Sequence, residues 1–415
     1  MLNILKNLAA VPKLFRHRKA NGQPVKRSKQ VIAAMLIISV VQCPVFYLPL
    51  QAAKAPENLY SSGAVLMDGD SGRVLYGNNE DAPLAMASTT KIMTCILALE
   101  YGTPGQIVTF SDTAAAMPDV QMNARAGEQY YLKDLMYSQK LESHNDSAVA
   151  VAEGISGSVE KFAALMNKKA EAIGCTHTNF VTPNGLDGTN EGGEHCTSPK
   201  DLALIMRYCV ALSSKADEFL EITGTASYSF SEITGKRNVF CSNHNALLNS
   251  YPGAVSGKTG FTGKAGYCYV GAAKRDGKIM IISLLGAGWY PHKSYKWKDA
   301  VKLYNYGFEN YSYQKLGKSD WDFPDIPVID GEKETIAIGT DAGEFTYLLG
   351  KGETVKCRVS YAKQIKAPVE KHTVIGNITY ELHGKVIEQF QIFTMEETQK
   401  ATLWLKIRRW VKNIF

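Results

Sequence analysis

The sequence predicts an α+β protein with two folded domains and a terminal helix. Apolar residues recur with a period near two at 63–77 and again at 266–286, and with helical spacing between those stretches. We therefore expect one antiparallel sheet, assembled from both ends of this region, with a cluster of helices inserted. From 328 to 394 the chain has short β-type runs separated by Gly and Pro turns, which predicts a small all-β domain. Residues 401–415 return to the helical period and predict an amphipathic helix.

The charge of the chain is concentrated at its ends. It has 415 residues, of which 45% are hydrophobic and 21% charged, so it is neither disordered nor fibrous. The net charge is +6, yet residues 1–55 contain nine Lys or Arg and no acid, and 400–415 contain five more. The body between them has 32 basic and 40 acidic residues, a net charge of −8. A nucleic-acid ligand requires positive charge on the folded body, so nucleic acid is excluded and a membrane at each terminus is favoured.

Residues 1–55 predict a signal peptide or an N-terminal membrane anchor. Eight basic residues precede an apolar run at 31–50, and Ala52, Ala53 and Ala55 follow it. This order is typical of a secretory signal, although twenty apolar residues are also enough to span a bilayer. In both cases the basic side stays in the cytoplasm and the rest of the chain is exported.

The predicted elements follow the chain in order. After strands at 63–68 and 73–77, joined by the turn 69–72, we expect helices at 90–101, 132–141, 147–155, 159–173 and 200–210. Strands at 266–274 and 278–286 flank a hairpin turn at Arg275-Asp276-Gly277, and a helix at 298–308 follows. The composition changes near 313–327. The predicted domains are 56–312, 313–394 and a tail at 395–415. The eight cysteines show no metal-type spacing and no disulfide framework, so we expect no metal and no cofactor.

Four Ser-x-x-Lys pairs occur, and their contexts differ. They begin at Ser88, Ser158, Ser312 and Ser360. Only Ser88 opens a strongly apolar helix, where Lys91 shares its face and free backbone N–H groups favour a developing oxyanion. A lysine can activate a serine only when its pKa is lowered, and Lys258 is the candidate cation for holding Lys91 neutral. The alternative is that Ser88 is a helix N-cap with a solvated Lys91; Ser158 looks like a plain N-cap.

Two further motifs are needed to interpret Ser88. Ser143-His144-Asn145 lies between two predicted helices and, taken alone, could be a helix boundary. Lys258-Thr259-Gly260 lies in a Gly-rich β-type run. A strand edge with a cation, a hydroxyl and open backbone suits an extended peptide, whereas the alternative is an ordinary loop.

Together and in this order, the three motifs are those of penicillin-binding proteins and β-lactamases. The chain resembles the serine D-alanyl-D-alanine carboxypeptidases, which are low-molecular-mass penicillin-binding proteins. The likeness extends over about residues 56–394 and includes Pro183-Asn184-Gly185-Leu186-Asp187, Ala265-Gly266-Tyr267-Cys268 and Ile365-Lys366-Ala367-Pro368-Val369. It implies a β-lactamase/DD-peptidase-like catalytic domain followed by the β domain.

The resemblance also implies roles for individual residues. Ser88 would be the acylated nucleophile and Lys91 its general base, while Ser143 and Asn145 would relay protons and bind the peptide. Lys258 and Thr259 would bind the terminal carboxylate beside the open backbone of Gly260, and the N–H groups of Ser88 and Phe261 would form the oxyanion hole. Two positions depart from the family: His144 stands where many relatives have glycine, and His244 where some have an arginine that assists carboxylate recognition. The second departure puts the strength or pH dependence of carboxylate binding in doubt.

By the same resemblance, the expected reaction removes the terminal D-alanine from peptidoglycan stem pentapeptides through an acyl-enzyme, with β-lactam antibiotics as covalent inhibitors. The expected location is the cell-wall space at the outer face of the bacterial cytoplasmic membrane. Two alternatives remain on the same fold. A class A β-lactamase would need a glutamate segment that we do not find between 147 and 257, and a non-catalytic wall-binding protein would be favoured by loss of Ser88 or Lys91.

The tail predicts a membrane contact. Leu403, Trp404, Ile407, Trp410 and Val411 recur along one helical stripe, and the basic residues fall largely off it. Such a helix is too short and too charged to span a bilayer, but its indoles and cations suit the interface of the outer leaflet. The alternative is that the stripe packs on the β domain.

Overall fold

The computed structural model describes residues 41–42, 54–118, 120–412 and 414 of the 415-residue chain. It divides into two compact units. The larger unit is Lys54–Asn310, and the smaller unit comprises Tyr311–Phe415 with the described pair Val41–Gln42. Apart from that pair and residues 54–55, the predicted leader lies outside the described residues.

A five-stranded antiparallel sheet forms the centre of the larger unit. Its strand order, β10-β11-β12-β2-β3, joins the first two strands of the unit to three strands from its C-terminal part, as predicted. The strands are β2 (Gly63–Asp68), β3 (Val74–Asn78), β10 (Ala254–Thr262), β11 (Gly266–Arg275) and β12 (Lys278–Leu285). Because β10 is first in this order, it is an edge strand.

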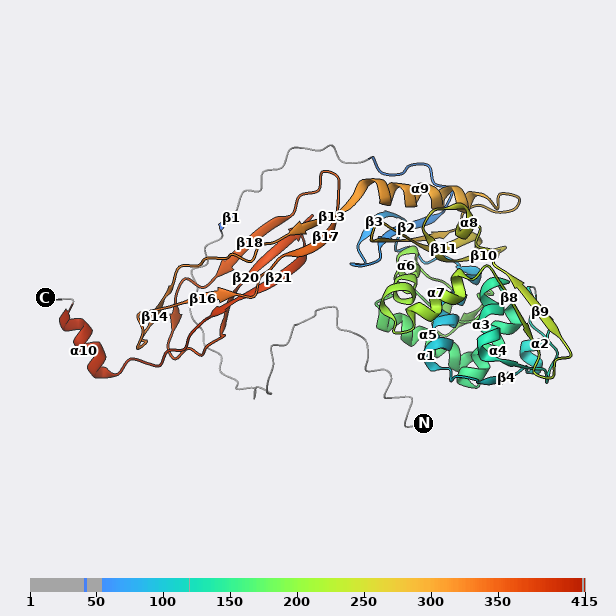
Figure 1. Cartoon of the computed structure of the whole chain (residues 1–415), viewed down its shortest axis with the longest axis horizontal. Coiled ribbons are helices and arrows are strands. Elements are labelled where there is room, and N and C mark those ends of the chain that lie inside the picture. Colours follow the sequence, from blue (N-terminus) through green and yellow to red (C-terminus); the bar gives the residue numbers. More distant parts are fainter. Residues whose placement is uncertain (1–40, 43–53, 119, 413, 415) are drawn as a thin grey trace. The chain divides into compact units, whose positions relative to one another are not determined.

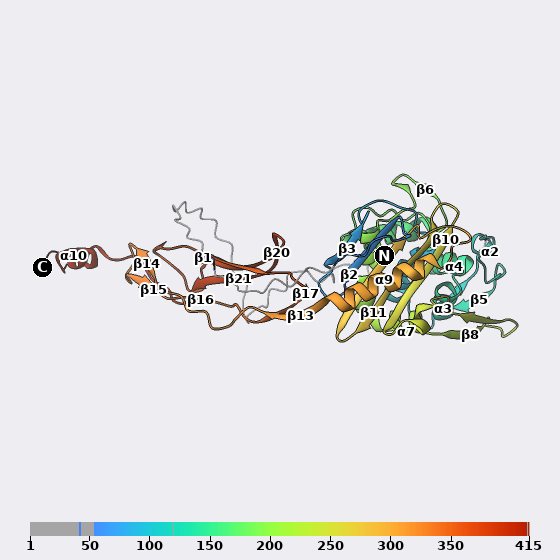
Figure 2. The same ribbon diagram turned by 90° about the horizontal axis from the view of Figure 1, so that it is seen from above.

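Helices cover the two faces of this sheet unequally. Helix α9 lies along β11 and β12 on one face, and the inserted cluster lies on the other (Figures 1 and 2). The helices are α1 (Lys91–Tyr101), α2 (Asp112–Ala115), α3 (Leu132–Leu141), α4 (Asn145–Ser156), α5 (Val159–Ile173), α6 (Pro199–Arg207), α7 (Ala216–Gly224), α8 (Leu247–Ser250) and α9 (Tyr295–Asn310). The main core therefore lies between the sheet and the cluster.

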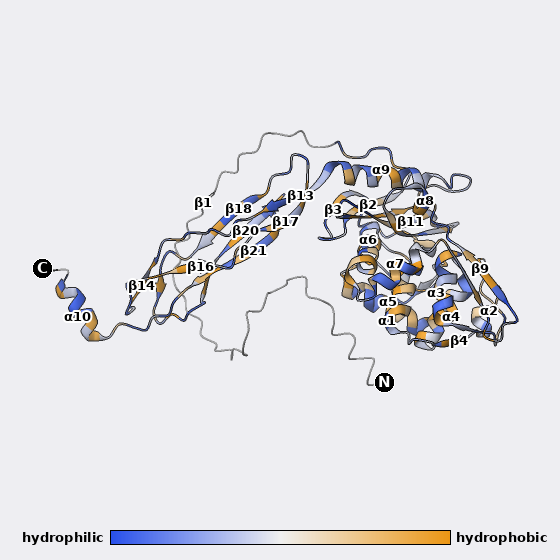
Figure 3. Cartoon of the chain, viewed as in Figure 1, coloured by the Kyte–Doolittle hydropathy of each residue, from blue (hydrophilic) through white to orange (hydrophobic). Residues whose placement is uncertain are grey.

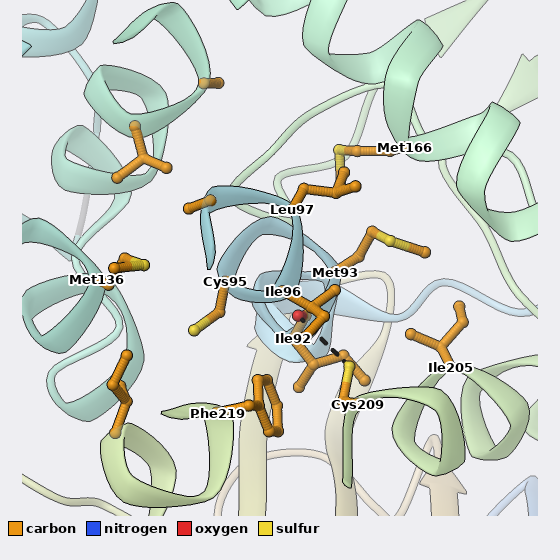
Figure 4. Packing of buried hydrophobic residues seen from close by; sticks show 14 of the residues in the cluster. Ile92, Met93, Cys95, Ile96, Leu97, Met136, Met166, Ile205, Cys209 and Phe219 are labelled. Atoms are coloured by element: carbon orange, nitrogen blue, oxygen red, sulfur yellow. Dashed lines mark hydrogen bonds between the residues drawn. The ribbon is translucent and has the colours of Figure 1, made fainter. Parts of the chain in front are cut away.

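Helix α1 is the centre of that core. Its residues Ile92, Met93, Ile96 and Leu97 are fully buried, and side chains of α3, α5, α6 and α7 surround them (Figure 4). Burying an aliphatic side chain of this size contributes about 1.5–3 kcal/mol to folding. The start of α1 is therefore held firmly, which matters because the candidate nucleophile lies directly before it.

The predicted hairpin turn between β11 and β12 is present. Arg275 pairs with Lys278, so the loop consists of Asp276 and Gly277, with φ values of +52° and +76°. Positive φ at both positions is typical of a type I′ turn, for which Asp-Gly is a preferred sequence.

The sequence did not predict several short elements of the larger unit. They are the hairpins β4 (Ile107–Thr109) with β5 (Gln129–Tyr131), β6 (Thr189–Asn190) with β7 (Gly193–Glu194), and β8 (Ser227–Ser231) with β9 (Asn238–Ser242). Runs of two to five residues are too short for periodicity to identify. Helices α2 and α8 have only four residues each and were missed for the same reason.

The smaller unit is the predicted all-β domain. Its strands are β1 (Val41–Gln42), β13 (Tyr311–Leu316), β14 (Ile326–Ile329), β15 (Thr335–Ile336), β16 (Ile338–Thr340), β17 (Phe345–Gly350), β18 (Lys356–Tyr361), β19 (Ile365–Lys366), β20 (Val374–Leu382) and β21 (Lys385–Thr394). The largest sheet has the order β1-β18-β20-β21-β16. A separate apolar core, which includes Ile378 and Ile392, stabilises this unit.

A helix, α10 (Leu403–Lys412), follows the β strands of the smaller unit. Hydrophobic and hydrophilic residues alternate along it (Figure 3). None of the helices that the structure describes is both long and apolar enough to cross a bilayer.

Candidate active site

Ser88 lies in a short 3-10 turn, η2 (Ala87–Thr90), that leads directly into α1. The sequence predicted a helix beginning near residue 90, and the structure adds this tighter turn in front of it. Ala87 has a positive φ of +49°, which turns the chain sharply before Ser88. Lys91 is the first residue of α1, and its Nζ donates a hydrogen bond of 2.8 Å to Ser88 Oγ. The predicted pairing at i and i+3 is therefore present.

Lys91 is completely buried and surrounded by oxygen acceptors. Its Nζ also donates to Asn145 Oδ1 at 2.8 Å and to the carbonyl oxygen of Asn184 at 2.6 Å. Burial lowers the pKa of Lys91 to about 7, and the negative charge of Asp146 opposes that shift. We expected the cation of Lys258 to lower this pKa, but removal from water is the main cause.

Ser143, His144 and Asn145 occupy the connection between α3 and α4. Ser143 has a φ of +69°, and Asn145 is the first residue of α4. The Nδ2 of Asn145 donates to the carbonyl of Pro118 at 3.0 Å, which fixes the amide with its oxygen toward Lys91. This connection therefore presents two polar side chains toward the start of α1 and β10.

Lys258 connects β10 to Ser143. Its Nζ donates to Ser143 Oγ at 2.9 Å and to the carbonyl of Thr259 at 2.8 Å. The side chain is 3% exposed, and burial holds the pKa of Lys258 well below its ordinary value, with repulsion from Lys91 and Lys140 adding to the effect. Burial is thus the main cause of the lowered pKa at both lysines, and repulsion from the other lysines adds to it at Lys258.

Glycine at 260 allows β10 to pass close to the turn at Ser88. A Cβ at Gly260 would lie 2.8 Å from the backbone nitrogen of Ser88 and 3.0 Å from that of Thr89. Any side chain there would force β10 and η2 apart. Gly185, with a φ of +89°, also approaches the turn at Ala87–Thr90. A Cβ built at Gly185 would lie 2.1 Å from the carbonyl oxygen of Ala87.

The next residues of β10 face alternately. Thr259 is half-buried, and Phe261 is 45% exposed and packs on Tyr267 of β11 with ring centroids 4.5 Å apart. Because alternate residues of a strand point to opposite faces, Lys258 and Gly260 share the face toward Ser88, and Thr259 and Phe261 share the other. The Thr259 hydroxyl can therefore meet a bound carboxylate only around the free edge of β10. Only the backbone of Phe261 is therefore available to a group held at Ser88.

The two histidines that depart from the family pattern have different surroundings. His144 is buried, its Nδ1 is 2.8 Å from Ser138 Oγ, and burial lowers its pKa. His244 is exposed, and its Nε2 lies 2.7 Å from a carboxylate oxygen of Glu142. Glu142 immediately precedes Ser143, so His244 is linked to the Ser143–Lys258 pair through that carboxylate.

The sequence alone assigned no role to two groups that the structure places at the site. The carbonyl oxygen of Asn184 accepts hydrogen bonds from both Lys91 and Ser88 Oγ, the latter at 3.3 Å. The Nζ of Lys140, buried in α3, donates to the carbonyl of Gly257 at 2.7 Å, one residue before Lys258. A backbone carbonyl has no signature in sequence, and an isolated lysine is ordinarily a surface residue.

The other Ser-x-x-Lys serines are structural or exposed. Ser158 caps α5, and its side chain accepts a hydrogen bond of 3.2 Å from the backbone N–H of Lys161, as predicted. Ser312 and Ser360 lie in the strands β13 and β18. Only Ser88, among the four, has its hydroxyl against a buried lysine amine.

This geometry combines a hydroxyl with a lysine whose neutral form is accessible near pH 7, beside backbone N–H groups and a second buried cation. The model of the D-alanyl-D-alanine carboxypeptidase family matches residues 50–288. The chain belongs to this family. Residues 311–400 match the C-terminal domain of penicillin-binding protein 5.

Several relatives of this family cover most of the chain. This chain is 32% identical to the D-alanyl-D-alanine carboxypeptidase DacF of Bacillus subtilis, in an alignment that covers 82% of this chain and 86% of that protein. It is 30% identical to DacA of Haemophilus influenzae, over 94% of this chain and all of that protein. The structure of penicillin-binding protein 5 from Haemophilus influenzae aligns with a TM-score of 0.66 at 28% identity, covering 84% of this chain and all of that one. The family and the predicted fold are therefore confirmed.

Proposed function

We propose that this protein is a serine carboxypeptidase that removes the terminal D-alanine from peptidoglycan stem peptides, with Ser88 as its nucleophile. The observation that carries the proposal is the 2.8 Å contact between Ser88 Oγ and the buried amine of Lys91. Family membership supports both the acyl-enzyme route and the sensitivity to β-lactams.

Acylation begins with the neutral form of Lys91. The amine accepts the proton of Ser88 as the hydroxyl oxygen attacks the carbonyl carbon of the penultimate D-alanine. The oxyanion that forms is stabilised by the N–H groups of Ser88 and Phe261, which is supported by the close passage of β10 beside η2. As the intermediate collapses, the peptide C–N bond breaks, and the proton taken up by Lys91 passes to the leaving amine with the Ser143 hydroxyl as relay. Asn145 Oδ1 accepts a hydrogen bond from Lys91 and keeps that amine in place. Water then hydrolyses the ester and frees Ser88.

Lys258 and Thr259 bind the carboxylate of the leaving residue. A bound carboxylate would favour the ammonium form of Lys258 and so oppose the burial that lowers its pKa, and the Lys258 Nζ is directed at Ser143 Oγ, 2.9 Å away. His244 faces Glu142, so it is a substrate-binding residue only through its effect on that carboxylate. The reaction needs no cofactor or metal for any of these steps.

The decisive experiment measures D-alanine release from a pentapeptide ending in D-Ala-D-Ala and covalent labelling by a fluorescent penicillin. Ser88→Ala is expected to abolish both, because one hydroxyl serves both acylations. Ser312→Ala, which alters an exposed serine of another Ser-x-x-Lys pair, is the matched control and should retain both. Labelling that persists in Ser88→Ala would refute the assignment.

The same experiment separates the two alternatives. A β-lactamase would hydrolyse the penicillin rapidly and leave no stable labelled protein, whereas a carboxypeptidase of this family retains the label. A non-catalytic wall-binding protein would neither release D-alanine nor be labelled.

We further propose that α10 holds the protein on the outer leaflet of the cytoplasmic membrane, with the folded units exported. The apolar stripe of the helix is exposed to solvent: Leu403 is 75%, Trp404 68% and Trp410 66% exposed. The basic side instead contacts the smaller unit, where Arg409 Nε lies 2.9 Å from Glu334 and Lys406 pairs with Asp330. These contacts favour the membrane over the alternative in which the stripe packs on the β domain.

A further inference from the structure

The three acceptors around the Lys91 amine differ in one chemical respect. A carbonyl or amide oxygen only accepts hydrogen bonds, whereas the hydroxyl of Ser88 can also donate one. A neutral amine has two hydrogens and one lone pair. The oxygens of Asn145 and Asn184, 2.8 and 2.6 Å from the Nζ of Lys91, can take both of these hydrogens. The lone pair is then left for the hydrogen of Ser88, so the proton transfer depends on where the two oxygens are held.

The two oxygens are held in different ways. Asn145 belongs to helix α4, but the carbonyl of Asn184 lies in a segment without helix or strand. Such a segment lacks the hydrogen bonds of regular structure, so side chains must fix its position. The hydroxyl of Thr94, one turn beyond Lys91 in α1, donates to the carbonyl of Pro183 at 2.6 Å. The two residues before Pro183 are held by a buried histidine, His195.

The hydrogen bonds of His195 define the form of its ring. Its Nδ1 lies 3.0 and 3.3 Å from the backbone nitrogens of Val181 and Thr182, which only donate, so Nδ1 is the acceptor. The proton is therefore on Nε2, which donates to the hydroxyl oxygen of Thr90 at 2.8 Å. That hydroxyl in turn donates to a backbone carbonyl of η2 at 2.8 Å. Burial and the charge of Lys91 lower the pKa of His195 to about 4, so the ring is neutral at neutral pH.

His195 thus connects two parts of the site. Thr90 directly precedes Lys91, and the residues bonded to Nδ1 lead within three positions to the carbonyl of Asn184. A change in the spacing between that carbonyl and the start of α1 would stretch these bonds. We propose that His195 is a positioning residue for acylation, which holds the Asn184 carbonyl against Lys91 and so directs the lone pair of the amine at Ser88. This role rests on the proposed function, in which Lys91 is the base.

The test uses the full chain and measures acylation by a fluorescent penicillin over a range of concentrations, together with D-alanine release from a D-Ala-D-Ala pentapeptide. Saturation separates the acylation rate constant from the dissociation constant of the initial complex. His195→Leu removes both ring contacts and should lower the rate constant by about tenfold to a hundredfold, because small displacements of a reacting group are costly. The dissociation constant should change by less than about twofold, since the variant leaves β10 untouched. His195→Gln can keep an acceptor and a donor, and should retain most of the rate.

Asn167→Leu is the matched control, because Asn167 holds the same segment one residue earlier. Its amide donates to the carbonyl of Phe180 at 2.8 Å and accepts from the Phe180 N–H at 2.7 Å. These two bonds do not reach the start of α1. The control variant should lose about as much thermal stability as His195→Leu, since each loses two hydrogen bonds to the segment, yet keep its acylation rate constant within about twofold.

If His195→Leu does not fold, Thr90→Val decides in its place, because it keeps the shape of the side chain and removes only the hydroxyl that His195 contacts. It should show the same loss of acylation rate. A rate constant that stays within about twofold in the variant that folds, an equal loss in Asn167→Leu, or a change confined to the dissociation constant would overturn the role of His195 alone. If the unaltered protein neither releases D-alanine nor is labelled, the proposed function itself fails.

Discussion

The pKa of Lys91 is set by two opposing effects on one side chain. Burial removes the ammonium group from water and favours the neutral amine, whereas Asp146 favours the charged form. Burial prevails, and the pKa falls to about 7. At neutral pH a large share of the molecules therefore holds the amine ready to accept the proton of Ser88.

We predict that acylation rises with pH through about 7 and levels off above it. The active form is the neutral amine, so protonation below this pKa removes the base. Lys91→Arg should not restore the reaction, because a guanidinium remains protonated at every accessible pH. The measurement is the second-order rate constant of fluorescent-penicillin labelling between pH 5.5 and 9. A flat profile, or substantial labelling of the arginine variant, would exclude Lys91 as the general base.

Sequence alone was informative about Ser88 and Lys91 because their contact is local. Three residues apart at a helix start, the two side chains meet whatever the rest of the fold does. The acceptor role of the Asn184 carbonyl and the burial of Lys91 depend on segments more than fifty residues away. Such contacts leave no periodic or compositional trace, so the extent of the pKa shift was not predictable.

Helix α3 is tied to the edge strand β10 by Lys140. Its Nζ donates to the carbonyl of Gly257, directly before the residue that binds the carboxylate in our proposal. Burial lowers the pKa of Lys140 to about 8, and the nearby thiols of Cys95 and Cys209 oppose that shift. Lys140 is thus a positioning residue that fixes the backbone from which Lys258 extends.

We predict that Lys140→Met raises KM for a D-Ala-D-Ala peptide by about fivefold to tenfold with a smaller change in kcat. One hydrogen bond that aligns β10 is lost, which corresponds to about 1 kcal/mol. The matched control is Lys278→Met, because Lys278 is also buried and donates to a backbone carbonyl, that of Phe308 at 2.8 Å, away from the site. Equal changes of KM in the two variants would reduce Lys140 to a general structural role.

At the scale of elements, periodicity predicted the long helices well and the short strands poorly. The range 132–141 was predicted for α3 and 159–173 for α5, and the structure has these same bounds. Both helices have a clear apolar stripe, and Ser158 caps the second. The hairpin of β8 and β9 was missed because its strands are short and because its aromatic residues Tyr228 and Phe230 pack on Tyr137 of α3 and Tyr130 of β5, contacts with distant segments that leave no pattern in the sequence.

In the whole molecule, the two sides of α10 differ in charge and in exposure to solvent. In α10 the basic side chains bond to the β14–β15 segment of the smaller unit, and the apolar stripe has no cover among the described residues. In this arrangement the exposed indoles of Trp404 and Trp410 are free to insert into a membrane interface.

We predict that the double variant Trp404→Ala with Trp410→Ala binds vesicles of anionic lipid at least about tenfold more weakly than the unaltered chain. Each substitution removes an indole that would insert at headgroup depth. Turnover of a small soluble peptide should barely change, since α10 contributes no residue to the proposed site. Flotation with the vesicles measures binding, and Val386→Ala, another exposed apolar residue of the smaller unit, is the control. Equal flotation of all three proteins would show that α10 is not the anchor.

The sequence by itself determined the local features of this protein: the periods that define strands and helices, the Ser88–Lys91 pair, the Asp276-Gly277 turn and the amphipathic tail. These depend on neighbours within a few residues, and therefore they can be read along the chain. Only the tertiary structure decided that residues 88, 143 and 258 meet, that Lys91 is enclosed by Asn145 and Asn184, and that His195 reaches Thr90. The physical reason is that burial and pKa depend on which distant segments exclude water from a side chain, and that arrangement is a property of the packed molecule.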